Sequence, residues 1–178
     1  MRAKYDPTDW YWKVGTDESS VWASGRLAFV PVSDADYQAW VARSDTITST
    51  IRDAADLLGV MLAQWMPRVL AAGVAVHSTA TPALNAVYSF DPNGSAARPG
   101  LTAITGISTG IASGKPLPSG GATFLYSDIT GASHAFTAAD FLNFAAAAEG
   151  YVYSLTQAVA ARIAGGTDEL PTVPLVIA

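Results

Sequence analysis

The sequence predicts an α+β fold, and three segments carry that prediction. Near the start, residues 10–14 alternate large apolar and more polar side chains, the period of two that is typical of a half-buried strand. Near the end, residues 138–163 repeat apolar side chains with the three-to-four spacing of a helix. A hairpin-like segment at 122–136 leads directly into that helix. Strands and helices are therefore both expected in one chain.

The first elements form a small antiparallel meander. Strand-like runs lie at residues 10–14, 21–23 and 27–32, with polar turns at 15–20 and 24–25. Pro31 has no backbone N–H to donate, so the third strand is expected at the edge of the sheet.

A short helix is expected next, from Asp34 to about Arg43. Ser33 is the predicted N-cap, with acidic side chains in the first turn. The helix carries Tyr37 and Trp40 on one side, and because it is short it must pack on the meander to be stable. The Ser/Thr-rich residues 44–50 are predicted to be a linker, which gives an N-terminal module at 1–43.

A second helix is expected from about Ser49 to Ala72, and it is unusually apolar. Its apolar side chains cover more than one face, which is typical of a helix that is deeply buried or shared with another subunit. Pro67 lacks an N–H, so a kink or break is predicted near Met66. Gly73 is the predicted stop. The residues expected at a subunit interface are Leu57, Val60, Met61 and Trp65.

The central domain, residues 44–166, then alternates short elements and turns. Strands are predicted at 74–78 and 86–90, a turn at 91–94, a poor helix or irregular stretch at 95–114 and a loop at 115–121. A hairpin pairs 122–126 with 133–136 around the turn 128–131. The last helix begins after the N-cap Thr137 and ends at Gly165 and Gly166.

The tail, residues 167–178, is expected to be extended. Pro171 and Pro174 keep it from rejoining the helix. Because Leu175, Val176 and Ile177 are too apolar for a free end, they are predicted to bind a neighbouring subunit or the chain's own domain, or to add a strand to an exposed sheet edge.

Composition excludes several classes of function. Half of the 178 residues are hydrophobic and 14% are charged, with a net charge of −5. No cluster of Lys and Arg offers a nucleic-acid surface, and the absence of cysteine excludes disulfides and thiolate chemistry. The start of the chain lacks the apolar region of a secretory signal, and the longest uncharged run of the second helix, 57–67, is too short to span a bilayer. So few charges suit a protein that buries its surface against partners.

The motifs that suggest chemistry are incomplete. Residues 109–116 place Thr and Pro where a phosphate-binding loop needs Gly and Ser or Thr. Residues 91–94 open like a calcium loop but carry Gly at the fourth position instead of the sixth. His77 and His134 have no neighbouring ligands at metal-site spacing. The sequence therefore predicts no catalytic, cofactor-binding or metal-binding residues, and a protein that is not an enzyme.

Several of these motifs resemble parts of bacteriophage tail proteins. Residues 68–163 look like a domain of unknown function that recurs in phage tail and prophage proteins. The segments that carry this resemblance are 73–76, 87–92, 126–131, 134–137 and the Ala-rich last helix. Residues 10–40 are similar to the leading module of tail-fibre and fibre-assembly proteins.

The resemblance implies a structural component of a fibre, baseplate or tail tip. Such a protein is made in the cytoplasm of the bacterial host and resides in the virion tail. Its partners are other tail or fibre proteins and copies of itself, with a trimer favoured by analogy. Two alternatives remain open: an assembly chaperone that binds the fibre tip, and a carbohydrate-binding receptor module that uses the many Trp and Tyr rings to stack on sugars.

Overall fold

The structure, a computed structural model, describes residues 5–43, 45–171 and 174–177. Part of the expected linker (Ser44), part of the tail and the first four residues lie outside this description. The fold is α+β, as the sequence predicts. The chain divides into two compact units, Met1–Arg68 with Thr156–Leu170, and Val69–Leu155 with Pro171–Ala178. This division differs from the expected ranges because the second helix and the last helix each contribute to both units.

The first unit is built on one sheet with the strand order β3-β2-β1-β4. Its strands are β1 (Tyr11–Val14), β2 (Ser20–Ala23), β3 (Ala28–Pro31) and β4 (Ser49–Ile51). Its helices are α1 (Ala35–Val41), α2 (Ala54–Val60), the π-helical turn η1 (Met61–Trp65) and the start of α3 (Met66–Ala72). The antiparallel meander of the first three strands is confirmed, with Pro31 at the end of the edge strand.

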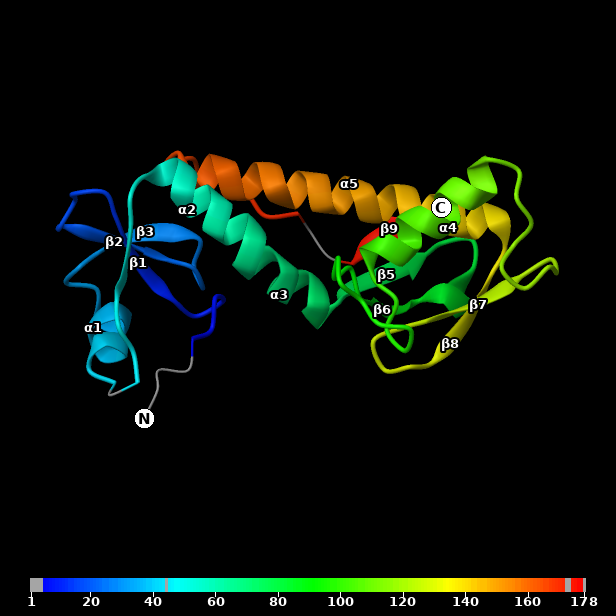
Figure 1. The fold of residues 1–178 in the computed structure, drawn as a ribbon, viewed down its shortest axis with the longest axis horizontal. Helices are drawn as coiled ribbons and strands as arrows, with labels where there is room; N and C mark the ends of the chain where they lie inside the picture. The colour runs from blue at the N-terminus through cyan, green and yellow to red at the C-terminus, as the bar shows by residue number, and fades with distance from the viewer. Residues whose placement is uncertain (1–4, 44, 172–173, 178) are drawn as a thin grey trace. The chain divides into compact units, whose positions relative to one another are not determined.

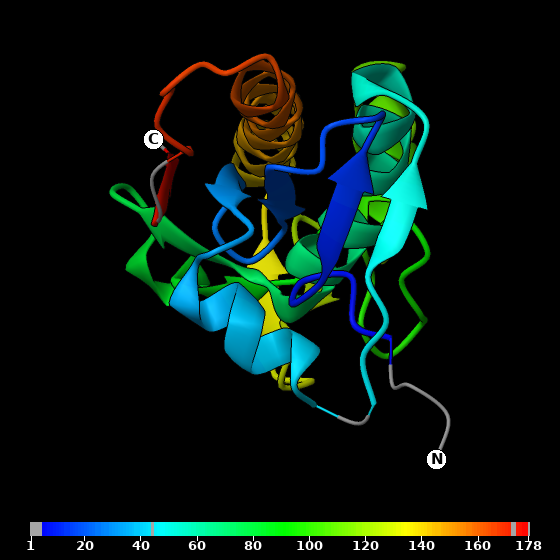
Figure 2. The same ribbon diagram turned by 90° about the vertical axis from the view of Figure 1, so that its left-hand side faces the viewer.

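Strand β4 lies inside the segment that the sequence marks as a linker. It pairs in parallel with β1, with Trp12 opposite Ser49 and Val14 opposite Ile51, and Figure 2 shows the two strands side by side with their arrowheads in one direction. Only Ile51 of its three residues is buried. So short a strand has no visible alternation, and its partner is distant in sequence, so no local pattern reveals it.

Helix α1 begins one residue later than expected, because Asp34 and not Ser33 is the N-cap. One Asp34 carboxylate oxygen accepts the backbone N–H groups of Asp36 and Tyr37, each at 3.1 Å. Tyr37 and Trp40 are buried, as predicted. The Trp40 ring centroid lies 5.2 Å from that of Tyr11 on β1, so the helix packs on the sheet.

The second helix differs from its prediction at two points. It begins at Ala54, after the N-cap Asp53, because the preceding residues form β4. At the place where a kink or break is expected, the helix does not end but departs from the α pattern in the π-helical turn, in which the Met66 N–H bonds to the carbonyl of Met61. The wider turn accommodates Pro67, which has no N–H for the usual four-residue pattern. The helix ends before Gly73, whose φ of 96° is a conformation that glycine adopts readily.

The second unit contains two small sheets, with orders β6-β5-β9 and β7-β8. Its strands are β5 (Val74–Ser78), β6 (Ala86–Tyr88), β7 (Phe124–Ser127), β8 (Ser133–Phe136) and β9 (Leu175–Ile177). Its helices are the 3-10 turn η2 (Pro82–Leu84), α4 (Leu101–Ala112) and most of α5 (Ala138–Ile163). The stretch expected to be a poor helix is thus helical only from Leu101, with Gly100 and not Ser95 as its N-cap.

Aromatic side chains of α5 hold the second unit together. The Phe144 ring lies 4.9 Å from Tyr88 on β6 and 5.4 Å from Phe136 on β8, and Figure 1 shows α5 running along both sheets. The helix starts as predicted: the Thr137 hydroxyl accepts the Asp140 N–H at 3.2 Å, while the Asp140 carboxylate accepts the Thr137 hydroxyl proton at 2.7 Å.

The tail returns to its own chain. Strand β9 pairs in parallel with β5, with Val76 opposite Leu175 and Ser78 opposite Ile177. Of the locations expected for the tail, the structure therefore confirms the one in which it adds a strand to an edge of its own domain.

Candidate functional site

Most of the expected helical interface residues are core residues. Leu57, Met61 and Trp65 expose 0%, 1% and 6% of their surface, and Val60 is half-buried. The apolar character of the second helix is therefore explained by burial within the chain. Three of the four residues offer no surface to a partner. A partner would have to bind surfaces that the folded chain leaves exposed.

The exposed side of this helix forms an open groove with a volume of about 450 Å³. Its lining residues are Thr50, Ile51, Arg52, Ala55, Asp56, Gly59, Val60, Ala63 and Gln64. At one end the Arg52 guanidinium bonds to the carboxylate of Asp56 at 3.1 Å. At the other, the Tyr5 hydroxyl donates to the side-chain oxygen of Gln64. Ala55, Gly59 and Ala63 are small, which leaves space along this side of the helix.

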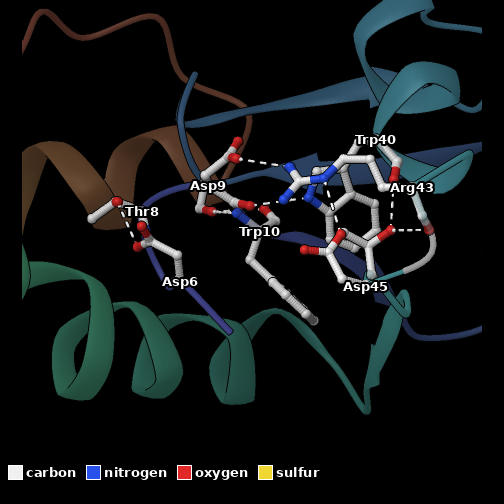
Figure 3. Close-up of polar contacts among 9 residues, drawn as sticks. Asp6, Thr8, Asp9, Trp10, Trp40, Arg43 and Asp45 are labelled. Carbon is white, nitrogen blue, oxygen red and sulfur yellow. Dashed lines mark hydrogen bonds and ion pairs between the residues drawn. The ribbon is translucent and has the colours of Figure 1, made fainter. Parts of the chain in front are cut away.

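A second hollow of about 250 Å³ lies beside α1. It is lined by Asp9, Tyr11, Asp36, Ala39, Trp40 and Arg43. Figure 3 shows the Arg43 guanidinium between two carboxylates, with an Nη1–Oδ2 distance of 3.5 Å to Asp9 and an Nε–Oδ1 distance of 3.2 Å to Asp45. The indole N–H of Trp40 donates to the Asp9 carbonyl at 3.2 Å. These contacts hold the rim of the hollow in place.

The charges at this hollow largely neutralise one another. Arg26 bonds to Asp34 at 2.5 Å and approaches Asp36 at 3.8 Å. The hydrogen bond from Arg26 is the main cause that lowers the pKa of Asp34 below its ordinary value. Arg43, which lines the hollow, and Arg26, which approaches its lining residue Asp36, are thus both engaged by aspartates of the same unit.

The tryptophans do not form a sugar-stacking surface. All five are in the first unit, and their exposed fractions are 7% or less. Trp10 packs edge-on against Trp40, with ring centroids 5.0 Å apart. The exposed aromatic side chains are Tyr5, Phe29 and Tyr153. The tryptophans whose rings suggested carbohydrate binding are therefore core residues.

In the second unit, His134 and Asp128 form the main polar cluster. One Asp128 oxygen accepts the Thr130 hydroxyl at 2.7 Å and the backbone N–H groups of Thr130 and Ala132 at 2.8 and 3.0 Å. The other oxygen lies 3.2 Å from His134 Nε2. The Thr130 hydroxyl is the largest of the causes that lower the pKa of Asp128 to about 2. The cluster closes the turn between β7 and β8.

His134 also ties this hairpin to the turn η2. Its Nδ1 lies 2.9 Å from the carbonyl oxygen of Ala83, and the Tyr88 ring stands edge-on at 5.6 Å. Both ring nitrogens are engaged by the protein, so His134 acts as a structural link and would have to give up a contact to serve as a general base. Burial raises the pKa of Tyr88.

The other histidine has different partners. His77 Nδ1 lies 3.1 Å from the side-chain nitrogen of Asn85, whose oxygen accepts the Ser78 N–H at 2.6 Å. Within residues 5–43, 45–171 and 174–177, no three His, Asp or Glu side chains are grouped so that they could hold a metal ion.

The surface of the second unit carries very little charge. Of the chain's 10 basic and 15 acidic residues, six lie in this unit: Asp91, Arg98, Lys115, Asp128, Asp140 and Glu149. Asp128 is buried and Asp140 caps α5. The sequence shows the low overall charge, but the scarcity of charge in the second unit depends on the boundaries of the units, which local patterns do not give.

Helix α4 forms the centre of this uncharged surface. None of its twelve residues is charged, and Ile104 is its only fully buried side chain. Between α4 and α5 lies a hollow of about 260 Å³. It is lined by Ser108, Thr109, Ala112, Leu142, Ala145, Ala146 and Glu149. Glu149, the single charge there, lies 3.4 Å from the Thr105 hydroxyl. We define this region as the α4–α5 surface.

The expected tail residues have three different environments. Leu175 is half-buried, Val176 is 61% exposed and Ile177 is 3% exposed. On β7, Leu125 is also exposed, at 71%. Of the seven residues expected at interfaces, Val176 is therefore the one with a largely open side chain.

No helix of the described residues has the length and apolarity needed to cross a membrane. Comparison of the chain with protein-family models, with curated proteins and with solved structures finds no match.

Proposed function

We propose that this protein is a structural component of a bacteriophage tail that works through protein–protein contacts. Its place would be a fibre, a baseplate or a tail tip, and its partners other tail or fibre proteins and copies of itself. The observation that carries the proposal is the nearly uncharged surface of the second unit, centred on the α4–α5 surface.

A surface of this kind suits burial in an assembly. The central part of a protein interface is depleted of charged residues, because a charge that loses water without a good partner costs free energy. On α4 the open positions are Thr, Gly and Ala, so Glu149 of α5 is the one charge of this hollow that a partner would cover. The first unit carries most of the chain's charges and suits contact with solvent.

The viral context comes from the resemblance of residues 68–163 and 10–40 to phage tail proteins. By the same analogy the oligomer is a trimer, formed after synthesis in the bacterial host and retained in the virion. The burial of all five tryptophans argues against the sugar-stacking alternative.

Mass spectrometry of purified particles tests the assignment. We expect stoichiometric copies of the chain in the particle. Its presence during assembly but absence from finished particles would instead support the assembly chaperone, and its absence from both would contradict the proposal.

Paired charge substitutions on α5 test the surface. Ala146→Glu places a carboxylate on the exposed part of the α4–α5 surface, and Gln157→Glu places one on an exposed position of the same helix in the first unit. We expect Ala146→Glu to reduce incorporation into particles by about tenfold or more, since a buried unpaired charge costs several kcal/mol. Equal incorporation of both variants would show that this surface is not an interface.

A further inference from the structure

Strand β9 is an edge strand formed by the last described residues of the chain. In the sheet order β6-β5-β9 it pairs with β5 alone, with Val76 opposite Leu175, His77 opposite Val176 and Ser78 opposite Ile177. Removal of β9 would leave the pairing of β5 with β6 intact. The strand is therefore separable from the rest of its sheet.

The segment that leads to β9 is exposed and is held to the end of α5 by hydrogen bonds, among them one from Arg162 Nε to the Asp168 carbonyl at 2.7 Å. Helix α5 ends at Ile163, Gly165 has a φ of 87°, and residues 164–170 are all exposed. This segment belongs to the first unit, whereas β9 belongs to the second. The chain thus carries an edge strand after the exposed residues 164–170, and identical elements of this kind can exchange between subunits.

The site on β5 recognises β9 through backbone bonds and one buried side chain. The N–H of Thr79 donates to the carbonyl of Ile177 at 3.0 Å, and the Ile177 side chain is 3% exposed. Val176, between its two neighbours, points outward and is 61% exposed. A second copy of the same tail would make the same contacts, so the site does not distinguish its own strand from that of a neighbour.

We propose that β9 is an exchangeable strand, and that in the assembled protein the edge of β5 accepts residues 174–177 of a second copy of this chain. Within one chain the connection holds the strand near its site at an effective concentration of about 1 mM, the usual range for a short linker. Copies packed side by side reach comparable local concentrations, so in an assembly exchange between copies competes with pairing within one chain. The inference does not rest on a viral origin.

Engineered cysteines can report which chain donates the strand. The natural sequence has no cysteine, so introduced thiols have no competitors. His77 and Val176 are directly opposite in the register and both exposed. Neighbouring strands lie about 4.8 Å apart, within the Cα separation that a disulfide spans. One full-length chain would carry His77→Cys and the other Val176→Cys, and the two would be mixed at about 1 mM and oxidised mildly.

We expect a disulfide-linked heterodimer, identified by its mass, in yields at least several times those of a control pair. The control replaces His77→Cys by Leu125→Cys, an exposed position on β7 that is not opposite the tail, and it measures random collision. Adding Ile177→Asp to the donor chain should reduce the heterodimer to this background, because it removes the buried anchor. Circular dichroism would verify that each variant is folded.

A heterodimer yield equal to that of the control pair, or one that Ile177→Asp does not lower, would overturn the proposal. In that event a chain with both His77→Cys and Val176→Cys would form only the disulfide within one chain. Particle content tests the proposed function separately, so failure of strand exchange would leave that test unaffected.

Discussion

The two units of this protein differ in how much charge their surfaces carry. In the first unit, aspartates and arginines surround the sheet and α1, and the Arg–Asp ion pairs of the described residues all lie there. In the second unit, only six residues are charged, and its open surface is made largely of Ser, Thr, Gly and Ala. The average composition of the chain hides this contrast, and the contrast indicates which unit is suited to meet partners.

The cores differ as well. The first unit holds all five tryptophans. The second holds five of the six phenylalanines, all of them buried, in a cluster around Phe144. Tryptophan emission therefore reports on the first unit alone, and this provides a means of following the two units separately.

The largest expected effect comes from the phenylalanine cluster. Phe136 is fully buried and its ring lies 5.4 Å from those of both Phe141 and Phe144. Phe136→Ala should reduce the free energy of unfolding of the second unit by about 3–5 kcal/mol, since it removes a large side chain and leaves a cavity. Urea titration followed by near-ultraviolet circular dichroism would measure it. If tryptophan emission gave the same loss in the free energy of unfolding, the two units would unfold as one.

Two glycines should respond in opposite directions. At Gly73, φ is 96° and a Cβ would stand 2.6 Å from Val87 Cγ1, so Gly73→Ala should destabilise the second unit by about 1–3 kcal/mol. At Gly59 in the first unit a Cβ meets nothing within 4 Å, so Gly59→Ala should stabilise by about 0.5–1 kcal/mol through helix propensity. Thermal unfolding of both variants measures the pair. Equal signs would contradict the geometry described for one of them.

Acid should affect the second unit through Asp128. Its pKa is lowered from 3.8 to about 2, so the stability that its charged form contributes is present above pH 3.8 and is lost as the pH falls toward 2. Asp128→Asn should remove this part of the pH dependence. Asp17→Asn is the matched control in the first unit: its pKa is also about 2, chiefly because of Ser19, but the side chain is exposed. We expect a smaller change there, measured by unfolding at several pH values.

The smallest effect is expected at the surface ion pairs of the first unit. Arg43 bridges Asp9 and Asp45, but its side chain is 47% exposed. Arg43→Ala should change the free energy of unfolding by less than about 1 kcal/mol, because water screens such pairs. Urea titration followed by tryptophan emission would measure the change, and high salt should abolish it. A larger loss would mean that the Arg43 ion pairs stabilise the first unit more than exposed ion pairs do.

Local patterns were sufficient for most elements. Alternation identified the meander, the Thr137–Asp140 pair marked the start of α5, and Gly73 marked the end of the second helix. These signals lie within a few residues of the structure that they specify, because capping, turn conformation and side-chain periodicity are local properties. The α+β class follows from them.

The tertiary structure decided what local patterns could not reach. β4 and β9 have three residues each, and their partners β1 and β5 are distant in sequence. Leu57 and Met61 have the same apolar character whether a neighbouring subunit or the chain itself covers them, and only packing shows that the chain does. The division of charge between the units likewise depends on which segments fold together. By itself the sequence determined the meander, the β7–β8 hairpin and the start of α5. Pairing, burial and the distribution of charge required the tertiary structure, because each depends on contacts between residues that are far apart along the chain.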